Sequence, residues 1–131
     1  MVQKDFLLDF DPYICERFGY RNSLHVTPTM NGCCIGVNIK PVKLYIRFWE
    51  YSNGVGGFPD WCIILVHCNF AKRQEEELQE LVRFFKEYAP RYGYKHIGIE
   101  NNQRLNEVLM LLQMRSAKED NHVIALTDIT I

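Results

Sequence analysis

Residues 61–68 read Trp-Cys-Ile-Ile-Leu-Val-His-Cys and begin the part of the chain that decides the fold. This run is apolar on both faces of a strand, which is typical of a central strand in a sheet. An amphipathic helix is expected over residues 71–89, then a strand over 94–100 and a second amphipathic helix over 103–114. Because these elements alternate almost without linkers, the two strands are expected to be parallel neighbours joined by a helical crossover.

The residues before this unit predict a meander of short strands. The segment from Leu24 to Tyr51 is interrupted by turn-forming residues at Pro28, Asn31-Gly32, Asn38 and Pro41. Over residues 42–49 apolar side chains alternate with Lys43, Tyr45, Arg47 and Trp49, so one face of that strand should lie on the core.

The two ends of the chain add one element each. The pair Asp11-Pro12 can begin a short helix that runs through Arg17, and Gly19 is expected to terminate it. The β-branched run over 122–131 predicts a strand near the end of the sequence. We therefore expect one α+β domain over residues 1–131, with a mixed, mostly antiparallel sheet, a central parallel pair and flanking helices.

Composition favours a globular protein and disfavours two other classes. Hydrophobic residues make up 47% of the 131 residues and charged residues 24%, close to globular averages. The 15 basic and 16 acidic side chains nearly cancel, which disfavours a dedicated nucleic-acid-binding protein, although Tyr45, Arg47 and Trp49 could stack on bases. The longest apolar run is too short to cross a bilayer and no signal-type core follows Lys4 and Asp5, so we expect a cytoplasmic protein without a membrane partner.

The five cysteines show neither metal-ligand nor disulfide spacing, and free buried thiols are the simplest interpretation: Cys15, Cys33, Cys34, Cys62 and Cys68. Strand alternation predicts Cys62 and Cys68 on one face and His67 on the other, which leaves no converging zinc ligands and predicts no metal site. His67 is either a structural histidine or a general base. The loop over 53–59 contains three glycines but joins two expected strands, so it is interpreted as a flexible hairpin connection or a lid rather than a phosphate cradle.

The second strand-to-helix turn carries a family resemblance. It reads Ile97-Gly98-Ile99-Glu100-Asn101-Asn102-Gln103-Arg104-Leu105, and the whole chain has a strand meander followed by strand, helix, strand, helix and strand. This pattern resembles the GNAT acyltransferase fold. The family has an Asn, then an Arg or similar residue, then an apolar residue at this turn, positions held here by Asn102, Arg104 and Leu105. A Gly-Phe pair near the end of the family's helix corresponds to Gln113-Met114 here.

The resemblance implies an acetyl-CoA or CoA site along Val66, Cys68, Lys72 and Arg73, with Asn102 on the cofactor side of the cleft. The family's Arg/Gln-x-x-Gly-x-Gly turn, which offers backbone N–H groups to the pyrophosphate, is replaced by residues 69–75 without glycine. Lys72 and Arg73 could instead meet phosphates through their side chains. Phage virion proteins with degenerate GNAT-like domains are similar in that they also replace the glycine turn with a basic helix start.

Two functions follow from this resemblance. One is an acyl-CoA-dependent N-acyltransferase that acts on a small amine or a protein amine, with His67 or Glu50 as the base. It lacks the family's usual acid, since the tyrosine expected seven residues after the Asn is Leu109. The other is a catalytically inactive GNAT-like domain that binds a protein partner, through the face of residues 42–51, or contributes to an assembly. A homodimer through the C-terminal strand is also expected.

Overall fold

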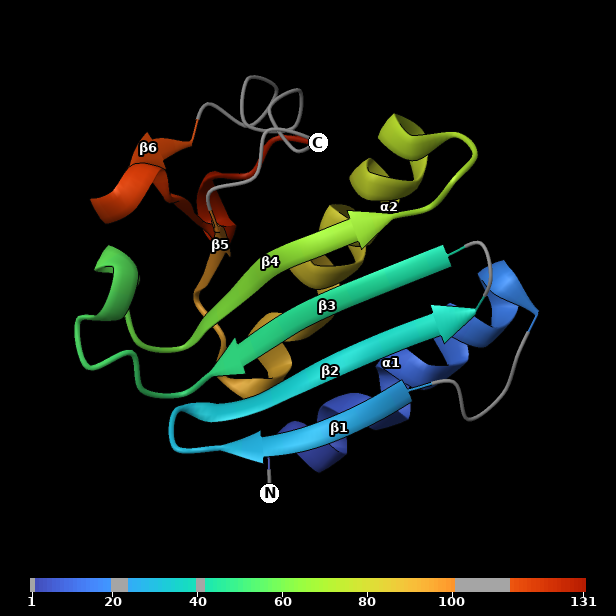
Figure 1. Cartoon of the computed structure of the whole chain (residues 1–131), viewed down its shortest axis with the longest axis horizontal. Helices are drawn as coiled ribbons and strands as arrows, with labels where there is room; N and C mark the ends of the chain where they lie inside the picture. The colour runs from blue at the N-terminus through green and yellow to red at the C-terminus, as the bar shows by residue number, and fades with distance from the viewer. Residues whose placement is uncertain (1, 20–23, 40–41, 101–113) are drawn as a thin grey trace.

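The computed structural model describes residues 2–19, 24–39, 42–100 and 114–131. Within these ranges one sheet has the strand order β1-β2-β3-β4-β5-β7-β6 (Figure 1). The strands are β1 (Leu24–Thr29), β2 (Gly32–Ile39), β3 (Val42–Trp49), β4 (Cys62–Asn69), β5 (His96–Ile99), β6 (Arg115–Ser116) and β7 (His122–Ala125).

The sheet is mostly antiparallel, with one parallel pair at its centre. β1 to β4 pair as antiparallel neighbours in chain order, which confirms the predicted meander. β4 and β5 are parallel, and β5 pairs antiparallel with β7. The α+β fold class expected from the sequence is therefore confirmed.

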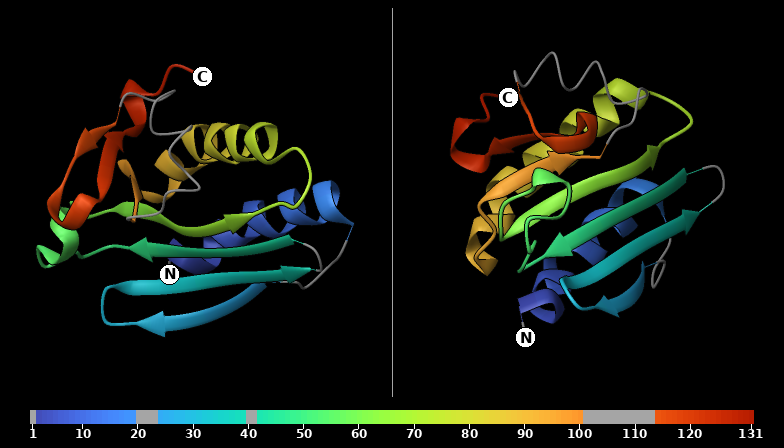
Figure 2. Two further views of the ribbon diagram at one scale, coloured as in Figure 1. Left: turned by 45° about the horizontal axis from the view of Figure 1, so that its top comes forward. Right: turned by 60° about the vertical axis from the view of Figure 1, so that its left-hand side comes forward.

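The two α-helices of the described residues cover one face of the sheet. They are α1 (Val2–Phe18) and α2 (Gln74–Tyr88) (Figure 2). The ring of Phe48 on β3 has its centroid 6.1 Å from that of Phe10 on α1 and 6.0 Å from that of Phe85 on α2. The face of Phe48 is called the helix-covered face below, and the opposite face, seen in Figure 1, is called the outer face.

Helix α1 begins earlier than the sequence suggests. The short helix expected from Asp11 is the second half of a longer one, with Pro12 inside it. Proline removes the hydrogen bond to the carbonyl four residues before it, here Leu8. Leu8 and Pro12 are both exposed, whereas Phe6, Phe10 and Ile14 are buried. The defect therefore lies on the solvent side, and the buried aromatic face stabilises the helix.

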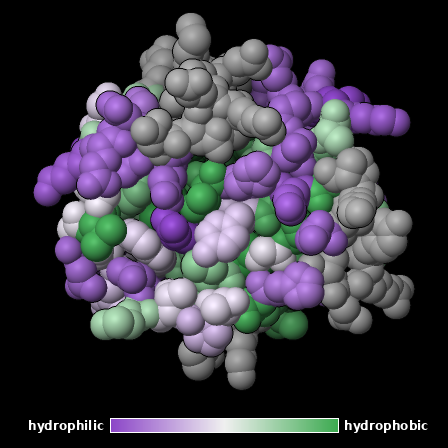
Figure 3. All heavy atoms as spheres, viewed as in Figure 1, coloured by the Kyte–Doolittle hydropathy of each residue, from purple (hydrophilic) through white to green (hydrophobic). Residues whose placement is uncertain are grey.

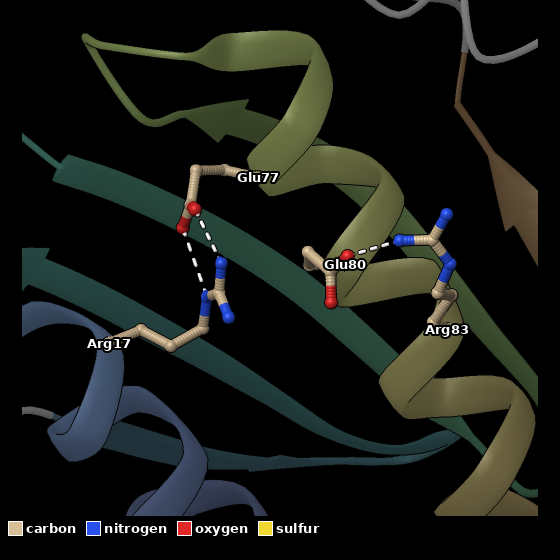
Figure 4. A network of polar contacts seen from close by, with 4 residues as sticks. All are labelled: Arg17, Glu77, Glu80 and Arg83. Carbon is tan, nitrogen blue, oxygen red and sulfur yellow. Dashed lines mark hydrogen bonds and ion pairs between the residues drawn. The ribbon is translucent and has the colours of Figure 1, made fainter.

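A bidentate ion pair joins the two helices. Arg17 Nη2 lies 2.6 Å from Glu77 Oε1 and Arg17 Nε lies 3.2 Å from Glu77 Oε2 (Figure 4). Glu77 is 9% exposed, so this carboxylate of the acidic first turn of α2 is turned inward to α1. Figure 4 also shows a second pair, Arg83 with Glu80, which lies on the exposed side of α2.

Strand β7 is not an open edge. It covers only His122–Ala125 and lies between β5 and β6. The chain then turns through a 3₁₀ helix at Leu126–Asp128, and Leu126 and Ile129 are buried in the core. The expectation of a strand that reaches residue 131 and extends into a second copy is therefore wrong for this segment. A homodimer remains a prediction, and β1 is the longer edge strand.

Candidate functional site

Strand β4 contains a β-bulge at Val66. Ile46 of β3 lies opposite Leu65, but the preceding Tyr45 lies opposite His67, so one residue of β4 has no counterpart on β3. A bulge adds a residue to one strand and changes which face the following side chains occupy.

The bulge corrects the expected placement of the cysteines. Cys62 packs with Ile64 on the outer face, whereas Cys68 packs with Ile63 and Leu65 on the helix-covered face. The prediction that Cys62 and Cys68 share a face is wrong because the extra residue reverses the alternation between them. His67 and Cys68 do lie on opposite faces, and His67 shares the outer face with Tyr45.

The bulge lies where the described pairing of β4 with β5 ends. The parallel ladder runs from Cys62 opposite His96 to Leu65 opposite Ile99, and the Glu100 N–H donates to the Leu65 carbonyl at 3.1 Å. β4 continues to Asn69. The carboxyl ends of parallel strands are the edge at which ligands bind in open sheets. Asn102, expected to contact the cofactor, lies outside the described residues.

Five side chains gather near this edge of the outer face, and we call them the outer-face cluster: Cys34, Tyr45, Arg47, His67 and Glu100. Arg47 of β3 forms an ion pair with Glu100, the residue after β5. The pair spans β4, which lies between the two strands. The Arg47 guanidinium carbon is also 5.9 Å from the ring centroids of both Tyr45 and Trp49. Figure 3 shows this face as a mixture of hydrophilic and hydrophobic side chains.

Tyr45 is held in its protonated form. A hydrogen bond with the Cys34 side chain is the main cause of a raised pKa for the Tyr45 phenol, and burial adds to it, while the positive charge of Arg47 opposes it. At neutral pH the phenol can therefore donate or accept a hydrogen bond beside His67, but it is not a base.

Glu50 lies at the other end of the sheet. It follows Trp49, which is opposite Cys62, the first residue of β4. With a rise of ~3.3 Å per residue, about 16 Å of strand separate Cys62 from His67. The Glu50 charge contributes to the raised pKa values of Cys33 and Tyr94, both buried on the helix-covered face. The structure therefore does not bring Glu50 and His67 into one site.

Three backbone donors of the turn between β4 and α2 are bonded within the turn. The N–H groups of Phe70, Ala71 and Lys72 donate to Gln74 Oε1 at 2.8 Å, Asn69 Oδ1 at 2.9 Å and the Phe70 carbonyl at 2.7 Å, respectively. Helix α2 begins three residues after the expected start because Ala71 and Arg73 adopt the left-handed conformation, with φ of 66° and 54°. These three N–H groups are not free to bind a phosphate. Lys72 and Arg73 are exposed and offer their cationic side chains.

The other two cofactor residues differ in accessibility. Val66 is half-buried and packs against the outer-face apolar cluster. Cys68 is 2% exposed, and burial raises the pKa of its thiol to about 12. A ligand on the outer face could therefore contact Val66 directly but would meet Cys68 only through its backbone.

The glycine-rich loop is packed rather than open. Asn121, which is buried, donates from Nδ2 to the Gly56 carbonyl at 3.1 Å, and Phe58 is 4% exposed. Phe58 lies so close to Gly98 of β5 that a Cβ there would come within 2.5 Å of its ring. The loop covers the amino-end half of the outer face, away from the bulge, so its packing gives no support to a lid over His67.

The sequence did not single out Tyr45, Arg47 and Glu100 as one site. Alternation placed Tyr45 and Arg47 on a common face, but nothing local to Glu100 indicates its pairing with a residue 53 positions away. Among the described residues, no group of three or more His, Cys, Asp or Glu side chains could hold a metal ion. In the same part of the chain, no helix has the length and apolarity needed to cross a membrane.

Comparisons of the chain with protein-family models, curated proteins and solved structures found no match.

Proposed function

We propose that this chain is an N-acyltransferase that binds the pantetheine arm of an acyl-CoA along the carboxyl half of β4 and transfers the acyl group to an amine. The bulge at Val66 is the observation that carries the proposal. It lies beyond the described pairing with β5, interrupts the ladder with β3 and is next to His67, whose side chain lies on the outer face. Bulges are frequent next to active sites, where they re-aim a side chain.

The chemistry of the pantetheine arm fits the end of a parallel strand pair, where β4 continues to Asn69 beyond its described pairing with β5. The arm is extended and contains amide groups, so it can pair with backbone N–H and C=O groups as an added strand does. The resemblance of the sequence to GNAT acyltransferases supports the same placement. The thioester would then lie near His67, beside the protonated phenol of Tyr45.

His67 is the proposed base. It would accept a proton from the amine as the amine nitrogen bonds to the thioester carbonyl carbon. The carbon–sulfur bond then breaks, and CoA leaves as its thiolate, which takes up a proton. Glu50 lies too far along the sheet to share this role with His67, so the proposal retains His67 alone.

The diphosphate of CoA must be held in a less specific way. Because the N–H groups of residues 70–72 are bonded within the turn, the proposal assigns the diphosphate to the exposed side chains of Lys72 and Arg73. Such contacts are screened by salt. Glu75 and Glu76 in the first turn of α2 weaken them further, so CoA should bind only modestly better than pantetheine.

Thermal unfolding with CoA and with pantetheine tests this proposal. Both ligands should raise Tm, since a ligand at 100 times its Kd stabilises by ~2.7 kcal/mol. The additional effect of CoA should disappear in Lys72→Glu/Arg73→Glu and at high salt, while the effect of pantetheine persists. The absence of a shift with either ligand at millimolar concentration would contradict the proposal.

The closed turn favours a second function, that of a GNAT-like domain without catalysis. Such a domain needs no anion site, and the aromatic and basic outer face of β3 would then contact a protein partner. A stable complex that survives His67→Ala but is lost in Tyr45→Ser/Arg47→Ser, in a protein that does not bind CoA, would support this second function over the first.

A further inference from the structure

A pocket of about 270 Å³ lies between the two α-helices. Five of its lining residues belong to α1, and the other two, Phe84 and Tyr88, belong to α2. Because α1 and α2 cover one face of the sheet and His67 lies on the other, this pocket is separate from the proposed site of acyl transfer.

The aromatic wall of this pocket is continuous across the two helices. The ring centroids of Tyr13 and Phe84 are 4.3 Å apart, and those of Phe84 and Tyr88 are 4.9 Å apart. Phe84 is buried, whereas Tyr13 and Tyr88 are half-buried. Leu8, which also lines the pocket, is 74% exposed. A ligand that covers Leu8 and the two tyrosines would remove apolar surface from water.

Two carboxylates line the same pocket and can be reached from solvent. Asp9, Tyr13 and Glu16 follow one another at spacings of four and three residues on α1, so they share one face of the helix. Glu16 is exposed and has no hydrogen bond or ion pair within the described residues. Asp9 is half-buried and accepts a hydrogen bond from the Tyr92 hydroxyl through Oδ2. Glu16 is therefore available to a ligand.

The charge of the pocket favours a cation. Asp9 and Glu16 are the charged members of its lining, which contains no lysine or arginine among the residues that the structure describes. The ion pairs drawn in Figure 4, between α1 and α2 and within α2, each cancel internally. Arg91 lies nearby with its guanidinium carbon 4.7 Å from the Tyr88 ring centroid, and its single charge offsets only part of the two carboxylates.

The tyrosine rings also suit a cation. The Arg17 guanidinium carbon lies 5.7 Å from the Tyr13 ring centroid, and that of Arg91 packs on Tyr88, so both rings already attract cations of the chain itself. The negative face of an aromatic ring attracts ammonium groups in the same way. The exposed Leu8 and the ring surfaces require such a cation to carry an apolar body.

We propose that this pocket binds a small organic ammonium ion with an apolar body. The ammonium group lies against Glu16, and the apolar body lies along Tyr13 and Tyr88 and covers Leu8. The volume is just below the usual range of drug-sized ligand sites, which limits the ligand to a small molecule. Binding here is independent of acyl transfer at the bulge of β4.

The test is an NMR titration of the full chain with phenethylammonium. The ring signals of Tyr13 and Tyr88 should shift saturably while the imidazole signals of His67 stay unchanged, which separates this pocket from an amine acceptor site on the outer face. Phenethyl alcohol lacks the charge and should bind about 5- to 30-fold more weakly. Methylammonium lacks the apolar body and should bind at least about 10-fold more weakly.

Two variants and one control locate the site. Glu16→Gln should weaken phenethylammonium binding about 2- to 5-fold, as expected for an exposed ion pair. Leu8→Lys should weaken it at least about 5-fold, because a tethered ammonium competes at high effective concentration. Both residues are exposed, so the two variants should fold. Glu76→Gln removes the same charge from an exposed residue of α2 outside the pocket and should leave the affinity unchanged.

Four results would each overturn the proposal. They are equal binding of phenethyl alcohol, equal affinity of Glu16→Gln and Glu76→Gln, shifts at His67 without shifts at Tyr13 and Tyr88, and the absence of binding at millimolar phenethylammonium.

Discussion

Tyr45 of β3 lies directly opposite His67 of β4, although the next residue, Ile46, lies opposite Leu65. The offset is the result of one extra residue, Val66. Without that residue, uninterrupted alternation from Leu65 to Cys68 would keep His67 on the outer face and Cys68 on the helix-covered face. The bulge is thus not needed for the inside-outside pattern of β4, which points to a functional role for it.

Removal of Val66 should separate function from folding. The deletion restores a regular register with His67 still opposite Tyr45, so we expect a folded protein whose free energy of unfolding falls by about 1–2 kcal/mol from lost packing. The proposed CoA-induced rise in Tm should be abolished, because the deletion removes the irregular part of β4 that is proposed to bind the pantetheine arm. Val66→Ala keeps the bulge and is the matched control; it should retain the CoA response. If the deletion variant still responds to CoA, the bulge is not the binding element.

The ion pair of Arg17 and Glu77 should contribute measurably to stability. The two side chains are 30% and 12% exposed, and Arg17→Ala leaves the Glu77 carboxylate largely buried without its partner. We expect a loss of about 1–3 kcal/mol in urea unfolding, less than for a fully buried pair.

The exposed pair of Arg83 and Glu80 on the same helix is the control for this measurement (Figure 4). Arg83→Ala should change the free energy of unfolding by no more than about 0.5 kcal/mol. Equal effects of the two arginine substitutions would show that burial does not strengthen the Arg17 pair.

Two strand glycines should respond in opposite ways to an added methyl group. At Gly98 a Cβ would lie 2.5 Å from Phe58 Cε1, so Gly98→Ala should destabilise the protein by about 1–3 kcal/mol through overpacking. At Gly36 the nearest atom is a backbone oxygen at 3.9 Å. Gly36→Ala should therefore be neutral or stabilise by up to about 1 kcal/mol. Urea unfolding measures the free energy of unfolding of the two variants. A destabilised Gly36→Ala together with an unaffected Gly98→Ala would contradict the packing described around these two glycines.

Stability should decrease in alkaline solution because of buried thiols. Burial raises the pKa of Cys33 and Cys68 from 9.0 to about 12. The unfolded chain loses these protons first, so stability is fully present below pH ~9 and falls by about 1.4 kcal/mol per pH unit for each thiol as the pH rises toward 12. Urea unfolding under reducing conditions at pH 8 to 11 measures the slope. Cys68→Val should make the slope less steep by the contribution of one thiol, about 1.4 kcal/mol per pH unit. An unchanged slope would contradict the raised pKa of Cys68.

Sequence periodicity was sufficient for much of the fold. The alternation over residues 42–49 and the apolar run over 61–68 predicted β3 and β4, and the strand-helix-strand order predicted the parallel pair. Helix α1 was predicted too short because Pro12 suggested a start, whereas tertiary burial of Phe6 and Phe10 extends the helix before it.

The candidate site was harder to predict than the fold. No glycine, proline or charged residue marks the bulge within Leu65-Val66-His67-Cys68, so simple alternation placed Cys68 on the wrong face. The ion pair of Arg47 and Glu100 depends on β4 lying between their strands, and such a long-range arrangement leaves no trace in local spacing.

A backbone NMR titration with acetyl-CoA tests the proposed function most directly. If β4 binds the pantetheine arm, the amide signals of residues 66–69 should shift saturably, together with the imidazole signals of His67, and pantetheine alone should reproduce those shifts. The absence of binding at millimolar acetyl-CoA, or saturable binding that leaves residues 66–69 and His67 unperturbed, would contradict the account.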